Sequence, residues 1–219
     1  MSFPPIVLRF LDWLKKTDGR DKLCRLVAYG SKIPIHLLKS IDGDKDTIDR
    51  LQKGASAVGT GRKFMRLFRA LQFLQDLLQS LGTGDLIERA ISSIKSASLT
   101  IWMLVDHHQW MAKAGYLRPS KELQERLSKL HSQAWAVGLF LGVLGSTYKL
   151  LKLSNESRTD KIASDLKVKR NKAVQGLAKN GIDLFIPLAR LGILSLNDGL
   201  VGLAGTVTSV IGIVDTFPK

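Results

Sequence analysis

The sequence predicts an all-α fold, a membrane-associated helical bundle. Apolar residues recur at helical spacing through most of the chain, and alternating β-branched runs are absent before the last twenty residues. The N-terminal part is basic and amphipathic, whereas the later segments become increasingly apolar. We therefore expect an N-terminal amphipathic helical region followed by Gly-rich apolar C-terminal helices.

The net charge and the cysteine content limit the kinds of partner and of metal site that this chain can have. The 219 residues include 33 lysines and arginines against 19 aspartates and glutamates, a net charge of +14. Such an excess predicts an acidic partner: a nucleic acid, an anionic membrane surface or an acidic protein. No helix-turn-helix pattern or other recognition module supports a nucleic acid. Cys24 is the only cysteine, which excludes an intrachain disulfide and a cysteine-based zinc site.

Turn and cap signals divide the N-terminal part into helices. We expect a short helix over 5–16, a stop at 17–19, and a second helix that Asp18 caps and Pro34 breaks or kinks. After a turn at 41–44, a long helix is expected from about residue 47 to 81, weakened by three glycines.

The remaining helices follow from similar signals. Residues 86–114 form a helix that Gly115 caps, and the next helix opens at Pro119 and Ser120. Residues 155–172 are polar and basic, a helix start or a mobile loop. Two last apolar segments, at 182–196 and 200–214, are separated by a turn at 197–199. We place a soft boundary near residue 82: region 1–82 is the amphipathic, membrane-remodelling part, and region 83–219 is membrane-embedded, with apolar segments near 132–150 and 182–214.

Residues 61–78 form the most informative stretch. At 3.6 residues per turn, phenylalanines and leucines take one broad face and arginines the opposite one. This pattern is typical of a helix in a membrane interface, although a helix docked on a protein core shows it too. The candidate membrane-binding residues are Arg62, Lys63, Phe64, Arg66, Leu67, Phe68, Arg69, Leu71, Leu74 and Leu78.

Two later runs are candidates for membrane helices. Residues 132–148 carry no formal charge, at the lower limit of a span, and the last segment is of similar length. Glycines at helical spacing allow close helix packing, in lipid or in a buried soluble core. The candidate packing residues are Gly138, Gly142, Gly202 and Gly205. The basic loop at 161–172 conflicts with two spans, because one basic region would then lie on the far side.

No pattern of catalytic, metal or cofactor residues emerges. Asp106, His107 and His108 are adjacent on a helix and diverge by about 100° per residue, so the two histidines do not readily bind one ion. The glycines at 59 and 61 lack the spacing of a phosphate loop. We expect no enzyme activity, no metal and no cofactor.

Several motifs occur in an order that resembles a known family. They are Thr17-Asp18-Gly19-Arg20-Asp21-Lys22-Leu23-Cys24-Arg25, Tyr29-Gly30-Ser31-Lys32, the basic stretch 62–69, Asp106-His107, 110–115, 198–202 and 205–209. Together they resemble the peroxin-11 family of peroxisomal membrane proteins, whose kinetoplastid members sit in glycosomes.

The resemblance implies a function in membrane remodelling. Members elongate the peroxisomal membrane before fission through an amphipathic helix that matches residues 61–78 here. They self-associate as homo-oligomers and are linked to a dynamin-like GTPase and its fission adaptors. The expected location is the peroxisomal or glycosomal membrane, and the expected lipid partner is an anionic phospholipid membrane. The alternative function is a pore for small metabolites.

Overall fold

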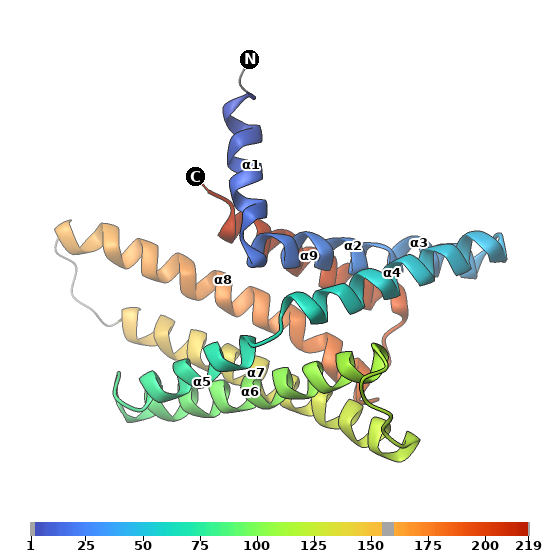
Figure 1. Cartoon of the computed structure of the whole chain (residues 1–219). Helices are drawn as coiled ribbons and strands as arrows, with labels where there is room; N and C mark the ends of the chain where they lie inside the picture. The colour runs from blue at the N-terminus through green and yellow to red at the C-terminus, as the bar shows by residue number, and fades with distance from the viewer. Residues whose placement is uncertain (1–2, 155–159, 219) are drawn as a thin grey trace. The chain divides into compact units, whose positions relative to one another are not determined.

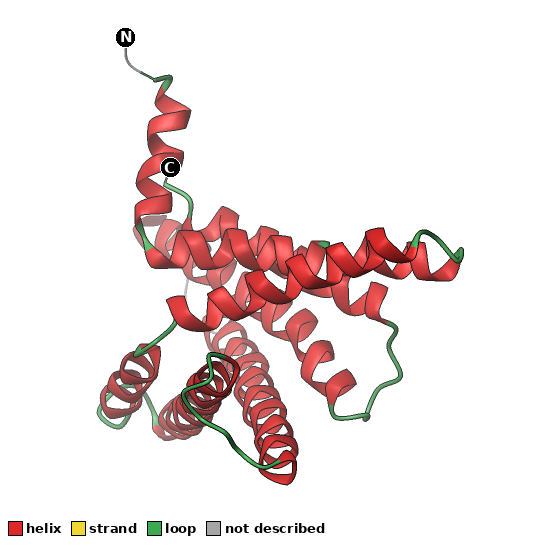
Figure 2. Cartoon of the chain, turned by 45° about the vertical axis from the view of Figure 1, so that its right-hand side comes forward, coloured by secondary structure: helices red, strands yellow, loops and turns green. Residues whose placement is uncertain are grey.

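The computed structural model describes residues 3–154 and 160–218, and for 160–164 it describes the backbone alone. Within these ranges the chain forms helices joined by turns and loops, without a strand (Figure 2). The prediction of an all-α fold is confirmed. In chain order the helices are α1 Pro5–Lys15, α2 Thr17–Gly30, α3 Lys32–Ser40, α4 Lys45–Met65, α5 Arg69–Ser80, α6 Leu86–Lys113, α7 Lys121–Ser154, α8 Asp160–Arg190 and α9 Asp198–Thr216 (Figure 1).

The helices belong to two compact units. The first unit comprises Met1–Leu67, His107–Arg118 and Leu194–Lys219, and therefore holds α1 to α4, the end of α6, and α9. The second comprises Phe68–Asp106 and Pro119–Ile193, and holds α5, most of α6, α7 and α8. The two units are defined by which residues pack together in space. The division into functional regions 1–82 and 83–219 stays a prediction.

In the first unit, α2 packs against α9 where α9 has small residues. A Cβ atom at Gly202 would lie 3.0 Å from the carbonyl oxygen of Tyr29, and one at Gly205 would overlap the Tyr29 ring. Beside this contact Arg25 Nη2 donates a hydrogen bond to Thr208 Oγ1 at 3.1 Å, and both residues are buried. Glycine on α9 therefore allows the approach that pairs two polar side chains in the core.

A buried ionic cluster joins α2 to α4. Arg62 Nε lies 3.1 Å from Asp21 Oδ1, and Arg66 Nε lies 3.9 Å from the same oxygen. The Asp21 side chain is 5% exposed and those of Arg62 and Arg66 are 11% and 10% exposed. Burial raises the pKa of the Asp21 carboxyl, but Arg62 and Arg66 outweigh burial, and its pKa lies below the ordinary 3.8. Asp21 is therefore charged at neutral pH and holds two guanidinium groups inside the unit.

In the second unit, glycines of α7 bring it close to α6 and α8. A Cβ atom at Gly138 would lie 2.7 Å from Leu99 Cδ2 of α6, and one at Gly142 would lie 2.6 Å from Asn180 Nδ2 of α8. The rings of Trp102 and Trp135 stack at a centroid distance of 5.6 Å. All four glycines named from the sequence thus lie at close contacts within the chain.

The helix predicted over 47–81 is interrupted. Helix α4 ends at Met65, and α5 begins at Arg69 after Phe68 adopts a left-handed conformation with φ of 64°. A bulky residue costs about 1 kcal/mol there, so tertiary contacts on the two sides must compensate. No glycine, asparagine or proline marks the break, which explains why the sequence did not predict it.

Smaller differences concern helix ends. Helix α2 starts directly after Lys16, and its first residue is Thr17, so Asp18 is not a cap. Pro34 lies inside α3, and the break between α2 and α3 falls at Ser31. The residues predicted as a turn at 197–199 instead start α9, since the Asn197 side chain accepts a hydrogen bond from Leu200 N at 2.8 Å.

Other predicted boundaries are confirmed. Gly115 has φ of 85° just after α6, as a helix-ending glycine should, and Ser120 Oγ accepts a hydrogen bond from Leu123 N at the start of α7. Within the segment predicted as a helix start or loop, residues 155–159 lie outside the described residues, and α8 runs from Asp160. The apolar stretch predicted at 182–196 is helical only to Arg190.

We expect Asp21→Asn to destabilise the protein by about 3 kcal/mol at pH 7, because it leaves two arginines buried without their carboxylate. For a chain of this length the loss corresponds to roughly 6–12 °C in the unfolding midpoint, measurable by circular dichroism in detergent. The matched control is Asp49→Asn, which removes an exposed pair with Lys53 and should cost less than about 1 kcal/mol. Equal losses in the two variants would contradict the importance of the buried cluster.

The lowered pKa of Asp21 also predicts how the stability difference between the unmodified protein and Asp21→Asn depends on pH. Because the pKa of Asp21 is lowered in the folded state, its stabilisation is complete above the ordinary value of 3.8 and is lost as the pH falls through the lower folded value. The stability difference between the unmodified protein and Asp21→Asn should therefore be constant from pH 7 to about pH 5 and shrink in more acidic solution. A difference that grows on acidification would mean that Asp21 is protonated when folded.

We expect Gly205→Ala to destabilise the protein by about 1–3 kcal/mol, because its methyl group would overlap the Tyr29 ring. The matched control is Gly59→Ala in α4, for which we expect stabilisation instead of destabilisation. A Cβ atom there meets nothing within 4 Å, so helix propensity alone acts and should stabilise by up to about 1 kcal/mol. Thermal unfolding of both variants measures the effect, and a neutral Gly205→Ala would refute the close packing.

Candidate membrane-binding site

Helix α5 has three faces. Ala70, Phe73, Leu77 and Ser80 are spaced three or four residues apart and are buried or half-buried. Ser80 Oγ lies 2.8 Å from Ser93 Oγ of α6, which places this face against the second unit's core. A second face is polar and exposed, and carries Gln72, Gln75, Asp76 and Gln79.

The third face of α5 is apolar and yet exposed. Leu71 is 62% exposed and Leu78 is 64% exposed, and Leu74 is also exposed. Phe68 lies just before α5 and is 75% exposed, and Leu81 just after it is exposed as well. We call Phe68, Leu71, Leu74, Leu78 and Leu81 the leucine face. An exposed apolar row of this length indicates a surface that meets lipid or another protein.

The basic residues of the predicted stretch lie elsewhere. Arg62 and Arg66 are buried beside Asp21 in the first unit, and Lys63 Nζ donates a hydrogen bond to Gln109 Oε1. Arg69, at the start of α5, is half-buried. In this structure the arginine face points into the protein, the reverse of the arrangement expected for headgroup binding. Headgroup binding by these basic residues stays a prediction.

The remaining predicted apolar residues, Phe64 and Leu67, belong to the first unit. Phe64 is exposed, and its ring lies 5.2 Å from that of Trp110, measured between centroids. Leu67 is half-buried in the break between α4 and α5. The structure therefore divides the predicted amphipathic stretch: Arg62 to Leu67 pack with the first unit and Phe68 to Leu78 with the second.

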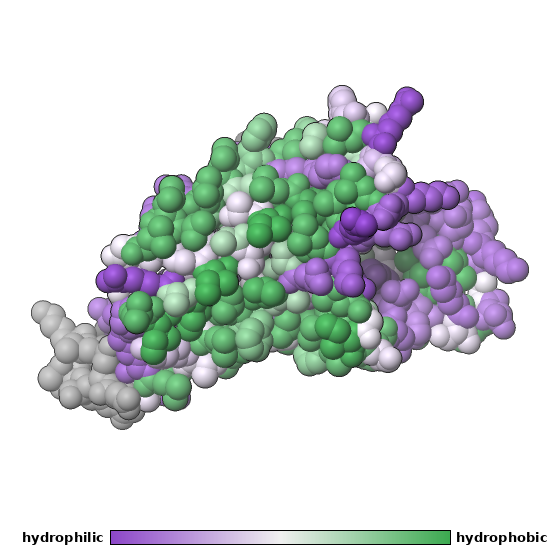
Figure 3. All heavy atoms as spheres, turned by 90° about the horizontal axis from the view of Figure 1, so that it is seen from below, coloured by the Kyte–Doolittle hydropathy of each residue, from purple (hydrophilic) through white to green (hydrophobic). Residues whose placement is uncertain are grey.

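Among the residues that the structure describes, two helices are long and apolar enough to cross a bilayer by length and composition. They are α7 and α9, and only 28% and 33% of their apolar windows are buried. The exposed apolar residues of α7 include a row that the sequence analysis missed, at an interval of seven residues: Leu123, Leu130, Val137, Leu144 and Leu151. Counting residues at that interval would have revealed this row. Figure 3 shows one face of the molecule, on which hydrophobic residues form a large exposed area.

Two residues of the Asp106-His107-His108 run have structural contacts, namely Asp106 and His107. His107 Nε2 lies 2.9 Å from the carbonyl oxygen of Arg66, and Asp106 Oδ1 lies 3.3 Å from His131 Nε2. Among residues 3–154 and 165–218, no three histidine, cysteine or carboxylate side chains form a group that could hold a metal ion.

Comparison with known proteins identifies the family. The family model for peroxisomal biogenesis factor 11 (PEX11) matches residues 7–217. Peroxisomal membrane protein PMP30B of Candida boidinii is 27% identical, with 99% of this chain and 96% of that protein covered. Human peroxisomal membrane protein 11A is 24% identical over 94% of both chains, and peroxisomal membrane protein 11D of Arabidopsis thaliana is 26% identical over 94% of this chain and 89% of that protein. No solved structure matches. With a family match over nearly its whole length, the chain belongs to the peroxisomal biogenesis factor 11 family and is a peroxisomal membrane protein.

Proposed function

We propose that this protein bends and elongates the peroxisomal membrane by inserting the leucine face of α5 into one leaflet, and that it thereby promotes peroxisome proliferation and fission. The observation that carries the proposal is the leucine face itself, an apolar row that the second unit leaves exposed while it buries the opposite side of the same helix.

The energy of insertion is sufficient for such a task. A leucine or phenylalanine gains about 1.5–3 kcal/mol when it is fully buried from water. Even half of that gain, summed over the five residues of the leucine face, amounts to roughly 4–8 kcal/mol. The helix is already folded in the structure, so insertion does not carry the cost of ordering its backbone.

Insertion on one side of a bilayer changes its shape. A helix that lies at the boundary between headgroups and acyl chains expands the leaflet that holds it. The membrane relieves the area mismatch between the two leaflets by curving toward the expanded side. The polar face with Gln72, Gln75 and Asp76 would then lie toward water, which fixes the rotation of α5 about its axis.

The partners of this activity follow from charge and from the resemblance. A net charge of +14 favours an anionic phospholipid surface, at about 1 kcal/mol for each cation close to it. Because Arg62 and Arg66 are buried here, exposed lysines and arginines elsewhere on the chain supply this attraction in our proposal. Self-association and recruitment of a dynamin-like GTPase with its adaptors remain further parts of the proposal.

We expect Leu71→Glu combined with Leu78→Glu to abolish the tubulation of anionic vesicles that contain the full-length protein, because each carboxylate would have to enter the acyl boundary. Electron microscopy of the reconstituted vesicles measures tubule length. The matched control is Gln72→Glu with Gln79→Glu, two carboxylates with the same seven-residue spacing on the polar face of the same helix. This control should tubulate within about twofold of the unmodified protein, since its charges stay in water.

Resistance to carbonate extraction should be unchanged in both variants, which shows that they remain in the membrane. Normal tubulation by the Leu71→Glu, Leu78→Glu variant would refute the wedge. Retention of an encapsulated dye during tubulation distinguishes bending from the alternative of a solute pore.

A further inference from the structure

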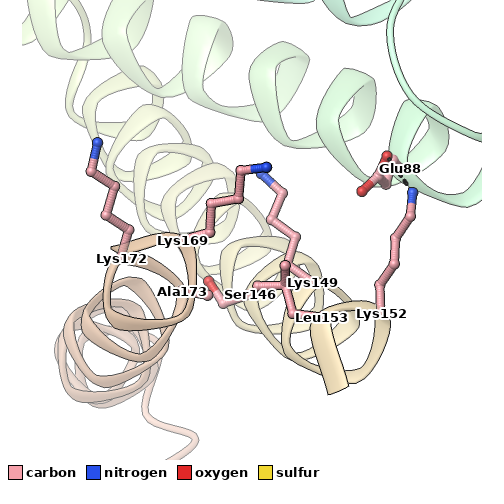
Figure 4. Close-up of a pocket in the computed structure, with 8 residues that line it drawn as sticks. All are labelled: Glu88, Ser146, Lys149, Lys152, Leu153, Lys169, Lys172 and Ala173. Carbon is pink, nitrogen blue, oxygen red and sulfur yellow. Dashed lines mark hydrogen bonds and ion pairs between the residues drawn. The ribbon is translucent and has the colours of Figure 1, made fainter. Parts of the chain in front are cut away.

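A cavity of about 430 Å³ lies between α7 and α8 in the second unit. It is formed by the C-terminal end of α7 and the N-terminal half of α8, with one residue of α6 at its edge. Half of the residues that line it are lysines, as Figure 4 shows, two from each of the two helices: Lys149, Lys152, Lys169 and Lys172.

Helical spacing explains why these four side chains share one cavity. Lys149 and Lys152 are three residues apart on α7, and Lys169 and Lys172 are three apart on α8, so each pair lies on one face of its helix. The two helices approach closely beside the cavity, where a Cβ atom at Gly176 would lie 3.0 Å from Ser146 Oγ. The lysines thus lie at the edge of a tight helix contact, where the amino groups of Lys149 and Lys169 extend toward each other (Figure 4).

The two carboxylates beside the cavity both pair with the same lysine. Lys152 Nζ lies 3.1 Å from Asp85 Oδ2 and 3.5 Å from Glu88 Oε2. Among the residues whose side chains the structure describes, no carboxylate forms an ion pair with Lys149, Lys169 or Lys172. Lys149, Lys169 and Lys172 thus have no paired carboxylate among the described side chains, and the four lysines together exceed Asp85 and Glu88 by about two positive charges.

A further lysine of the second unit, on α6, lies close to other lysines. Lys95 of α6 is half-buried, and its pKa lies below the ordinary 10.5, first because of burial and then because Lys149 and Lys179 are near. Asp76 offsets this only in part. Helices α6, α7 and α8 thus each place cations near one another, a repulsive arrangement that a bound anion would relieve.

The amount of charge indicates the chemistry of the anion. With Lys95 and Lys179 added and Asp76 subtracted, this part of the unit holds an excess of about three positive charges. A phosphomonoester carries about −1.5 to −2 at neutral pH, so two such groups supply about the charge that this excess requires. A single carboxylate or phosphodiester supplies only one negative charge. A cavity of about 430 Å³ falls within the usual range of small-molecule sites, about 300–1,000 Å³.

The position of the cavity along α7 favours a lipid as the source of these phosphates. Lys149 directly follows the uncharged run 132–148, at the end where that run meets charged residues. Exposed Leu144 and Leu151 lie on the same helix, one on each side of Lys149 along the chain. Lysines at the end of an apolar helix are placed at the depth of lipid headgroups.

We propose that the cavity formed by Lys149, Lys152, Lys169 and Lys172 binds a headgroup with two or more phosphate groups, supplied by a polyphosphorylated membrane lipid. Such a site is separate from the leucine face of α5. It would make the protein responsive to the kind of anionic lipid present, where a general attraction to negative surfaces would not discriminate.

The test uses the full-length protein in detergent and calorimetric titration with three probes. They are a short-chain phosphatidylinositol bisphosphate, a short-chain phosphatidylserine, and soluble inositol trisphosphate. We expect the bisphosphate lipid to bind at least tenfold more tightly than phosphatidylserine. We also expect Lys149→Gln with Lys169→Gln to weaken that binding at least tenfold.

The matched control is Lys121→Gln with Lys129→Gln, which removes the same charge from exposed positions at the other end of α7. It should change the affinity by less than about twofold. Without ligand, Lys149→Gln with Lys169→Gln should unfold at the same temperature as the unmodified protein or higher, because it relieves repulsion, and this shows that the variant is folded.

The probes also separate the sources of the phosphates. Tighter binding of the lipid than of inositol trisphosphate assigns the site to a membrane lipid, as proposed. Equal or tighter binding of inositol trisphosphate overturns the lipid as the source and leaves a soluble polyphosphate. Equal losses in the cavity variant and its control, or equal affinity for phosphatidylserine, would overturn the site altogether. Tubulation by the leucine face is scored separately, so either proposal can fail alone.

Discussion

The buried carboxylate of Asp21 is the constraint on which the orientation of α4 depends. A charge in the interior is tolerated only when opposite charges and hydrogen bonds compensate for lost hydration. Asp21 obtains this compensation from Arg62 and Arg66, one helical turn apart, so α4 must turn the side with these two residues toward α2. The side with Phe64 is then left exposed. One buried ionic cluster thus determines that the arginine face of this stretch points inward.

Glycine has a complementary role in both units. At Gly205 in the first unit and at Gly142 in the second, a neighbouring side chain occupies the space that a Cβ atom would need. Close approach of this kind holds helices together through packing, without a large buried apolar surface between them. The larger apolar side chains are consequently free to face outward. The exposed rows on α5 and α7 agree with this division, and so does the location of the protein in the peroxisomal membrane.

The sequence predicted those parts of the fold that local signals encode. The end of α6 and the start of α7 carry their own glycine or cap residue, and the helical spacing of apolar residues is enough to establish an all-α chain. The break at Phe68 was not predictable, because a phenylalanine at positive φ is imposed by tertiary contacts and opposes its own preference. The arginine face was expected at a membrane surface because its partner within the protein could not be identified from local sequence. That partner, Asp21, lies 41 residues before Arg62, and no local pattern connects the two.

The candidate sites differ in how far sequence spacing could reveal them. The leucine face repeats at three and four residues within one helix, so periodicity finds it. The lysine cavity combines pairs from α7 and α8 that each look like an ordinary solvated face. Its significance arises only when the two helices pack and the nearby carboxylates prove too few. In the first unit Asp21 lies close to both buried arginines, whereas in the second Asp85 and Glu88 both pair with Lys152 and leave three lysines of one cavity without a carboxylate partner among the described side chains. In our proposal, the phosphates of a lipid headgroup take the place of that missing partner.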